Sequence, residues 1–246
     1  MSSKFLTFLF FISVHTANIT NAFTAPTMGI GAILFKPKNM AFEPSIGDDT
    51  LLVNAARFFT DAFWANKNPN LKELSSKQKI SLSQQQVSEF RRRYGLKLGK
   101  DRRSELIVCQ NKESGEVMGC AGIEVSNIST PNGKSIQFAA PLMSNLAVGR
   151  KFRRKGIAED LVKATEQLAL KSWGYDECYL YVEKANTPAV KLYRKLGYVK
   201  QWEDDTATSL IPTSRGNVVS TPTVLVCMKK SLRGGLSLGR FFPFGS

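Results

Sequence analysis

The sequence predicts an α/β fold, with a mixed, mostly antiparallel central sheet flanked by helices in a single domain. Two observations predict this class. Two helical patterns near the start are followed by apolar runs of strand length joined by short turns, which favours an antiparallel meander. After residue 144, strand and helix patterns alternate, which adds the mixed character. At 246 residues and 43% hydrophobic content, the chain can bury one full core, and we expect the domain over residues 49–230.

The first half of this domain begins with two predicted helices. Thr50–Trp64 has apolar residues at helical spacing, and the preceding Asp48 and Asp49 suit an N-cap. The stretch Asn66–Gln85 is polar and rich in Lys, Ser and Gln, which predicts an insertion or a flexible loop. Gln85–Leu98 is predicted to form the second helix, which ends in basic residues.

Three strands joined by two turns are predicted to follow. Ser104–Gln110 and Glu116–Val125 are apolar runs around the turn Asn111–Gly115, as in a β-hairpin. A second turn at Ile128–Lys134, which contains Pro, Asn and Gly, leads into the strand Ser135–Val148.

The remaining elements alternate before a final pair of strands, and the residues 231–246 are expected to form a disordered tail. Gly174 and Gly197 suit the ends of the two helices in this half. In chain order we expect a helix at Gly156–Trp173, a strand at Glu177–Val182, a helix at Asn186–Leu196, and strands at Tyr198–Glu203 and Pro222–Met228 around a polar loop.

Residues 1–22 have the pattern of a secretory signal peptide. Lys4 precedes the apolar run Phe5–Val14, which is too short to span a bilayer. The small residues Thr20 and Ala22 suit cleavage directly after position 22. We therefore expect no stable membrane insertion.

Residues 23–44 are predicted to be a transit-peptide-like segment. Asn21–Pro26 resembles the A-F-A-P junction of bipartite plastid presequences, and Phe23–Phe42 contains no acidic residue. The resemblance implies import into the plastid (chloroplast stroma). Secretion is the alternative, and it would expose the sequon at Asn127 to glycosylation and the cysteines to oxidation.

The formal net charge of +14 predicts anionic partners without identifying them. Residues 67–103 hold eleven Lys or Arg against three Asp or Glu, a run that is as consistent with a solvated face as with a binding surface. Because the run contains Arg91–Tyr94 and Arg102–Arg103, a ribosome- or nucleic-acid-binding module is an alternative from another functional class.

The histidine and cysteine content excludes several kinds of chemistry. His15 is the only histidine and lies in the expected signal peptide, so Ser-His-Asp and Cys-His nucleophilic systems and His-containing zinc sites are excluded. The cysteines contain no C-x-x-C pair, and each lies in or beside a predicted strand, which favours buried, reduced thiols and no metal. They are Cys109, Cys120, Cys178 and Cys227.

Arg153–Ala158 is predicted to form a basic turn between a strand and the N-terminus of a helix. The backbone N–H groups of a first helical turn and the positive end of the helix dipole attract an anion. Gly156 and Ala158 are small enough to let an anion approach the backbone, and the neighbouring cations add charge. Taken alone, the pattern is equally consistent with a basic helix start on an ordinary surface.

Two longer motifs contain this turn and a second helix: SNLAVGRKFRRKGIAEDL (Ser144–Leu161) and VEKANTPAVKLYRKLGYV (Val182–Val199). Together they resemble the acetyl-coenzyme A site of the GNAT superfamily of N-acetyltransferases. The resemblance covers about residues 49–230 and implies a single catalytic domain that uses acetyl-CoA as co-substrate and no metal. The cofactor contacts that it implies are Leu146, Ala147, Val148, Arg153, Arg154, Lys155, Gly156, Ile157, Ala158, Glu159 and Asn186.

The family also implies roles for these positions. The backbone of the strand at Leu146–Val148 would pair with the pantetheine amides, with one N–H facing the thioester carbonyl, while its side chains remain core. Asn186 would contact the cofactor, and Tyr193, seven residues later, would lie next to the thioester sulfur and act as the catalytic acid. From the residues alone, an N-cap for Asn186 and a core position for Tyr193 are the alternatives.

The implied reaction is attack of a neutral amine on the thioester, with Tyr193 protonating the leaving thiolate. The base is not assigned: related amino-terminal acetyltransferases often have Glu where this chain has Tyr181, and Glu183 and Glu124 are candidates. Similarity to plastid acetyltransferases implies protein or peptide substrates with free amines, at amino termini and also at lysines. A small-molecule amine acetyltransferase is the alternative, although no acidic cluster marks a pocket for a polycation.

Overall fold

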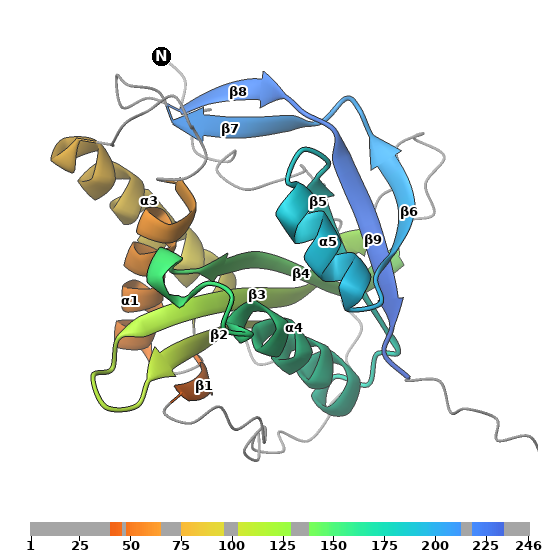
Figure 1. Ribbon diagram of the computed structural model, residues 1–246, viewed down its shortest axis with the longest axis horizontal. Coiled ribbons are helices and arrows are strands. Elements are labelled where there is room, and N and C mark those ends of the chain that lie inside the picture. The colour runs from red at the N-terminus through yellow and green to blue at the C-terminus, as the bar shows by residue number, and fades with distance from the viewer. Residues whose placement is uncertain are drawn as a thin grey trace, which may run out of the picture.

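The computed structural model describes residues 40–45, 48–64, 75–95, 103–128, 138–212 and 218–233 (Figure 1). The expected signal peptide at residues 1–22 and the first part of the expected transit segment, residues 23–39, lie outside the described residues. So do residues 234–246 of the expected tail.

A seven-stranded sheet in the order β1-β2-β3-β4-β5-β9-β6 forms the centre of the domain. All neighbours in it are antiparallel except β4 and β5, which run parallel, so the expected mixed, mostly antiparallel sheet is confirmed. The strands are β1 Met40–Pro44, β2 Ser104–Asn111, β3 Val117–Ile128, β4 Phe138–Val148, β5 Glu177–Glu183, β6 Val199–Asp204 and β9 Leu225–Ser231.

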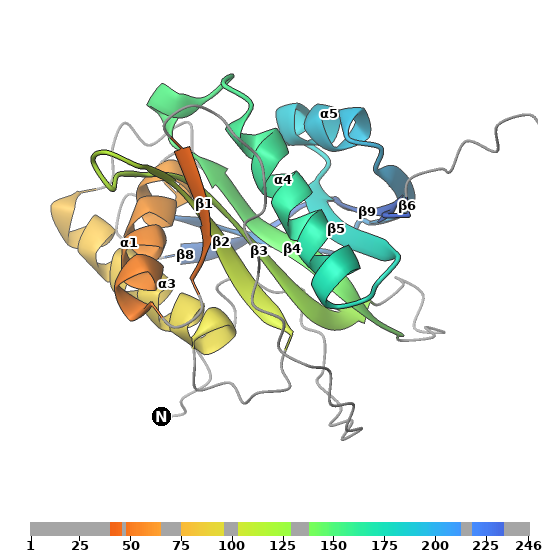
Figure 2. The same cartoon turned by 90° about the horizontal axis from the view of Figure 1, so that it is seen from below.

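Helices cover both faces of this sheet, as Figure 2 shows. Leu106 and Val108 of β2 pack with α1 and α3, whereas Ile107 and Cys109 of the same strand pack with α4 on the opposite face. The second half of α4 and the helix α5 pack on β5 and β9. The helical elements are α1 Asp49–Phe59, the π-helical turn η1 Thr60–Trp64, α3 Ser76–Tyr94, the 3-10 turn η3 Arg150–Phe152, α4 Ile157–Gln167, the π-helical turn η4 Leu168–Ser172 and α5 Thr187–Lys195.

The loop prediction for Asn66–Gln85 is wrong from Ser76 onward, because α3 begins there. A capping box starts the helix: Ser75 Oγ accepts the N–H of Gln78, and the Gln78 side chain accepts the N–H of Ser75. The polar composition of this first part hid a buried face, since Gln78 is 9% exposed and Leu82 is 3% exposed.

Three further segments differ from the sequence prediction. β1 lies within residues 23–44, which were expected to be transit-like, and it pairs with β2 along its whole length. The polar loop before β9 contains a hairpin of β7 Thr208–Pro212 and β8 Val218–Pro222, which forms a second, two-stranded sheet. Ordered chain also continues into the expected tail: Ser231 completes β9, and buried Leu232 donates its N–H to the Asp176 carbonyl.

All four cysteines are buried and unbridged, which confirms the expectation of reduced, buried thiols. Burial raises the pKa of the Cys109, Cys178 and Cys227 thiols to about 12, so they stay protonated at neutral pH. Their protonated state and burial are those of structural cysteines rather than of nucleophiles.

Candidate active site

The parallel strands β4 and β5 separate in the middle of the sheet. They pair only at Leu142 with Tyr179 and at Met143 with Leu180. Beyond Met143, β4 keeps β3 as its partner, and no described strand pairs with the edge that faces β5. A strand edge of this kind presents N–H and C=O groups to an extended ligand.

Leu146, Ala147 and Val148 lie on this open part of β4, as the sequence predicts. Ala147 is 7% exposed and packs in the core beneath α1 and α3, while Leu146 and Val148 pack against the cluster under α4. Ala147 is therefore a core residue, while the half-buried Leu146 and Val148 pack at the edge of the core.

A basic turn connects the end of β4 to α4. It begins where Gly149 donates its N–H to the Met118 carbonyl at 3.0 Å, and it ends at Gly156, the N-cap of α4. Two of its residues have left-handed backbone angles, Arg154 with φ 64° and Gly156 with φ 84°. A Cβ atom added to Gly156 would meet no atom within 4 Å, so the space beside the first turn of α4 is open.

The cations of this turn lie at the surface beside the β4 edge. Arg153, Arg154 and Lys155 are exposed, and Arg153 Nε donates to the Val148 carbonyl at 3.2 Å. The first N–H groups of a helix have no intrahelical acceptor, and no side chain caps α4. Backbone donors and the positive end of the helix dipole thus face an open space, and three exposed cations precede it in the chain, an arrangement suited to binding a phosphate group.

The first turn of α4 is formed by Ile157, Ala158 and Glu159. The side chains of Ile157 and Glu159 make contacts within the protein. Ile157 is 1% exposed and belongs to the core, so only its backbone can face a ligand. The Glu159 carboxylate accepts from Lys163 at 2.8 Å and from Lys195 of α5 at 2.9 Å. These hydrogen bonds lower the pKa of Glu159 to about 2.

The Glu159–Lys195 ion pair joins the helices of the two motifs. α4 and α5 lie side by side, as Figures 1 and 2 both show, and the pair crosses between them. The structure therefore brings together the two motif helices that are about thirty residues apart in the sequence. The Glu159 side chain serves this contact, while its backbone N–H remains in the first turn of α4.

Asn186 and Tyr193 lie at the start and near the end of α5. Asn186 is the N-cap of α5, because its side-chain oxygen accepts the Ala189 N–H at 3.3 Å. This is the structural role that the residues alone offered as the alternative to a cofactor contact. Tyr193 is 7% exposed and packs edge-on against Tyr198, with ring centroids 5.8 Å apart. Burial raises the pKa of Tyr193 above its ordinary value, so the phenol keeps its proton at neutral pH.

The two candidate bases have partners within the chain. Glu124 is 4% exposed and forms a bidentate ion pair with Arg93, at 2.7 and 3.3 Å. Glu183, at the end of β5, accepts the Ser209 hydroxyl of β7 at 2.6 Å. Glu124 is thus a structural partner of Arg93, and Glu183 is the carboxylate closer to the open end of β5.

Each arginine of the run in α3 has an acidic partner, and Arg91 and Arg92 stay about half exposed at the surface. Arg91 pairs with Asp49 at 2.5 Å, Arg92 pairs with Glu89 at 2.6 Å, and Arg93 is buried against Glu124. The sequence shows the charge of these arginines but not their ion-pair partners, which come from α1, from α3 itself and from β3.

The arrangement adds no sign of a metal or of a membrane span within the described ranges. No group of three or more His, Cys, Asp or Glu side chains there is placed to hold a metal ion. No helix among those residues is both long enough and apolar enough to cross a bilayer.

Comparison with known proteins shows the family of this chain. The model of the acetyltransferase (GNAT) family matches residues 69–198, more than half of the chain. An N-alpha-acetyltransferase of Saccharolobus solfataricus is 39% identical over 56 residues, which are 23% of this chain and 34% of that protein. The chloroplastic GCN5-related N-acetyltransferase 4 of Arabidopsis thaliana is 45% identical over 56 residues, 23% of this chain and 19% of that protein. The matches thus span 34% and 19% of the length of these relatives.

Solved structures share the fold at low sequence identity. The ribosomal-protein-S5-alanine acetyltransferase of Vibrio fischeri superposes with a TM-score of 0.56 at 15% identity, covering 81% of this chain and 97% of that one. A spermidine N-acetyltransferase of Vibrio cholerae gives 0.50 at 15% identity, covering 79% and 94%. Given the family match over more than half of its length, the chain belongs to the acetyltransferase (GNAT) family.

Proposed function

We propose that this enzyme acetylates amines of proteins, first the α-amino groups of amino termini and then some lysine side chains. The observation that carries the proposal is the local similarity to N-alpha-acetyltransferases and to a chloroplastic acetyltransferase, at 39% and 45% identity. An α-amine has a pKa of about 7.7–8.0 and is partly neutral near pH 8, whereas lysine, near 10.4, is not. An enzyme that relies on amines that are already neutral should therefore acetylate α-amines more readily than lysines.

In this proposal the chain holds acetyl-CoA along the open edge of β4. The backbone of Leu146–Val148 pairs with the pantetheine amides, and the turn Arg153–Ala158 binds the pyrophosphate. The site fits such a group, because the space beside Gly156 is open and the edge of β4 that faces β5 has no described strand partner beyond Met143. One backbone N–H near Val148 donates to the thioester oxygen as negative charge develops there.

The transfer then needs one acid and one acceptor of a proton. The amine nitrogen attacks the carbonyl carbon, the C–S bond breaks, and the leaving sulfur takes the proton of the Tyr193 hydroxyl. The extra proton on the nitrogen leaves to water or, through water, to Glu183. The tyrosinate recovers its proton from solvent, so no net charge stays on the enzyme.

The pairing of acidic side chains supports a protein amine over a polyamine. A spermidine-like polycation needs several carboxylates that are available to it. In the described part of the chain, Glu124, Glu159 and Glu203 each form ion pairs with Lys or Arg. A small-molecule amine acetyltransferase is the second candidate, and the fold shared with a spermidine N-acetyltransferase is what favours it.

Mass spectrometry of acetylated peptides tests the proposal. The chain from Phe23 to Ser246 is expressed in a bacterium, and acetylated amino termini and lysines are compared with a strain that expresses the Gly156→Glu variant. In the strain that expresses the wild-type chain we expect newly acetylated α-amino groups, and we expect newly acetylated lysines to be less numerous than these termini. Acetylated spermidine without any new protein acetylation would contradict the proposal and establish the small-molecule activity.

We further propose that the protein acts in the plastid, supported by the junction at Ala22–Phe23 and by the chloroplastic relative. A fluorescent fusion tests it, and it should carry residues 1–39 only, because Met40 is the first residue of β1. The fusion should enter the plastid, and Phe23→Ala should prevent entry while Thr24→Ala should not. Fluorescence in the medium would instead establish secretion.

A further inference from the structure

A β-bulge lies in β4 directly before the open edge. Cys120 of β3 faces Ala147, but Gly122 faces Ser144, so Asn145 and Leu146 together oppose the single residue Ala121. Asn145 has a left-handed backbone, with φ 53°, which few residues other than glycine adopt. The bulge therefore follows Met143, where the pairing with β5 ends, and its second residue is the first of Leu146–Val148.

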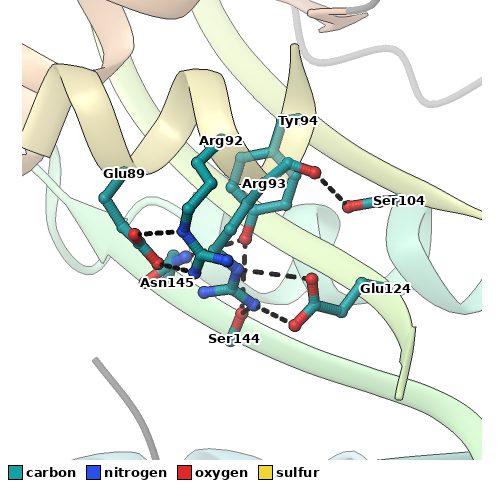
Figure 3. A network of polar contacts seen from close by, with 8 residues as sticks. All are labelled: Glu89, Arg92, Arg93, Tyr94, Ser104, Glu124, Ser144 and Asn145. Atoms are coloured by element: carbon teal, nitrogen blue, oxygen red, sulfur yellow. Dashed lines mark hydrogen bonds and ion pairs between the residues drawn. The ribbon is translucent and has the colours of Figure 1, made fainter. Parts of the chain in front are cut away.

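Side chains from the end of α3 hold this bulge, as Figure 3 shows. The amide nitrogen of Asn145 donates to the Tyr94 hydroxyl at 2.7 Å, and that hydroxyl lies 3.4 Å from Ser144 Oγ. Asn145 is 9% exposed, and among the described residues its other amide atom, Oδ1, has no hydrogen-bond partner. Tyr94 thus provides the hydrogen bond that anchors the buried Asn145 side chain.

The position of Tyr94 is built into β3 as well. A Cβ atom at Gly122 would lie 2.0 Å from the Tyr94 hydroxyl oxygen, so the tyrosine occupies a space that only glycine leaves open. The ring packs edge-on against Phe90 within the core, and burial raises the pKa of Tyr94 to about 12. The hydroxyl is therefore a neutral, fixed hydrogen-bonding group at any working pH.

Hydrogen bonds of Arg93 also connect the end of α3 to β3 and β4. The guanidinium of Arg93 bonds both Glu124 of β3, at 2.7 Å, and Ser144 Oγ of β4, at 2.9 Å. Ser104 of β2 donates its hydroxyl to the Arg93 carbonyl at 2.7 Å. The end of α3 is thus bonded to β2, β3 and β4 around the bulge, with Arg93 and Glu124 buried and the two serines half-buried.

We propose that Tyr94 is a positioning residue for acetyl transfer: through Asn145 it holds the β4 bulge, which aims the backbone of Leu146–Val148 at the thioester. A bulge sets the direction in which the following residues present their backbone and side chains. Without the Tyr94 hydroxyl, the Asn145 amide is buried with no anchor, and it must turn to find another partner. The open edge of β4 then loses its fixed alignment with the reacting carbonyl. The inference needs only the acetyl-transfer activity and not the protein substrate proposed above.

Tyr94→Phe is the primary test, because it removes one oxygen atom and keeps the ring. We expect kcat to fall by about tenfold to a hundredfold, since a small misplacement of reacting groups has effects of that size. The KM of the amine should stay within about twofold of the wild-type value, because the variant does not change how the amine binds in the ground state. The matched control is Tyr179→Phe, which removes a phenol hydroxyl bonded to Glu177 on β5 and should leave kcat unchanged.

Asn145→Gly tests the route from Tyr94 to the strand. Glycine keeps the left-handed backbone but lacks the anchored amide, so it should lower kcat as Tyr94→Phe does. If Tyr94 acts through Asn145, the double variant should have the same kcat as either single variant rather than the product of the two losses. If Tyr94→Phe fails to fold, the kcat of Asn145→Gly tests the inference alone. It is measured at a temperature below the unfolding midpoint of that variant.

A binding measurement separates this inference from the proposed substrate. Calorimetry with acetyl-CoA and with CoA requires no amine, and the thioester carbonyl contact is present only in the former. We expect Tyr94→Phe to weaken acetyl-CoA binding by about threefold to tenfold relative to CoA, as the loss of one hydrogen bond would. Unchanged kcat in a folded Tyr94→Phe enzyme, an equal loss in Tyr179→Phe, or additive losses in the double variant would overturn the inference.

Discussion

Gly156 gives the sharpest test of where acetyl-CoA binds, because the chain contains a matched control for it. Gly156 and Gly174 both have left-handed backbones, with φ 84° and 73°, and a Cβ atom at either position meets no atom within 4 Å. They flank the same helical segment, α4 with η4. Substitution at either site therefore has the same local steric effect, and only Gly156 adjoins the basic turn.

The expected loss of stability follows from the backbone alone. A left-handed residue other than glycine costs about 1–2 kcal/mol, with no steric clash to add to it. For a domain of this size, that lowers the unfolding temperature by about 2–8 °C. Gly156→Glu and Gly174→Glu should therefore destabilise the protein by similar amounts, measured by thermal unfolding.

The expected loss of affinity differs between the two variants. A carboxylate about 4 Å from a phosphate charge is repelled by about 1 kcal/mol in a water-like medium and by about 4 kcal/mol near a protein surface. Gly156→Glu should thus weaken acetyl-CoA binding by about fivefold to about 900-fold, whereas Gly174→Glu should not change it. Calorimetric titration of both folded variants measures this difference. Equal acetyl-CoA affinities for the two would refute the assignment of the pyrophosphate to the α4 turn.

Three further outcomes are expected from other residues. Tyr193→Phe should keep acetyl-CoA affinity and lower kcat by about tenfold or more, and full turnover on every amine would leave the hydroxyl without a catalytic role. Glu124→Gln should destabilise by about 3–5 kcal/mol in urea unfolding, because it removes the carboxylate charge that faces the buried Arg93 guanidinium, and a loss below about 1 kcal/mol would contradict this. The pKa of Glu159 falls from 4.5 to about 2 on folding, so its stabilisation is present above pH 4.5 and is lost as pH falls toward 2. Glu159→Gln should therefore flatten the acid-unfolding profile between these pH values, and an unchanged slope would contradict the pairing.

Much of the fold could be predicted from local patterns, and the exceptions have physical causes. The hairpin of β2 and β3 and the alternation after residue 144 follow from periodicity and turn residues. The first part of α3 was missed because it buries only Gln78 and Leu82, and Gln78 is a polar residue whose side chain accepts the N–H of Ser75. β1 was missed because a short edge strand carries almost no pattern of its own and is defined by its partner β2.

The site could be predicted as far as it is encoded in contiguous residues. The turn at Gly156 and the caps of α4 and α5 are local, so their motifs reveal them. The network of Tyr94, Asn145 and Glu124 joins residues from three distant segments, and no spacing rule connects them. The charge of the arginine run was visible in the sequence, but its neutralising partners depend on how α3 packs against the sheet.

Amide chemical shifts of the labelled protein during a CoA titration test the central assignment most directly. We expect the largest shifts at the backbone amides of Ala147 and Val148 and at those of Gly156–Ala158, because these groups line the β4 edge and the first turn of α4. A second basic recess, lined by Lys191, Arg194 and Lys200, lies between α5 and the strands β6 and β9 and offers another place for an anion. Shifts concentrated on that recess, with the β4 edge unperturbed, would contradict the site described here.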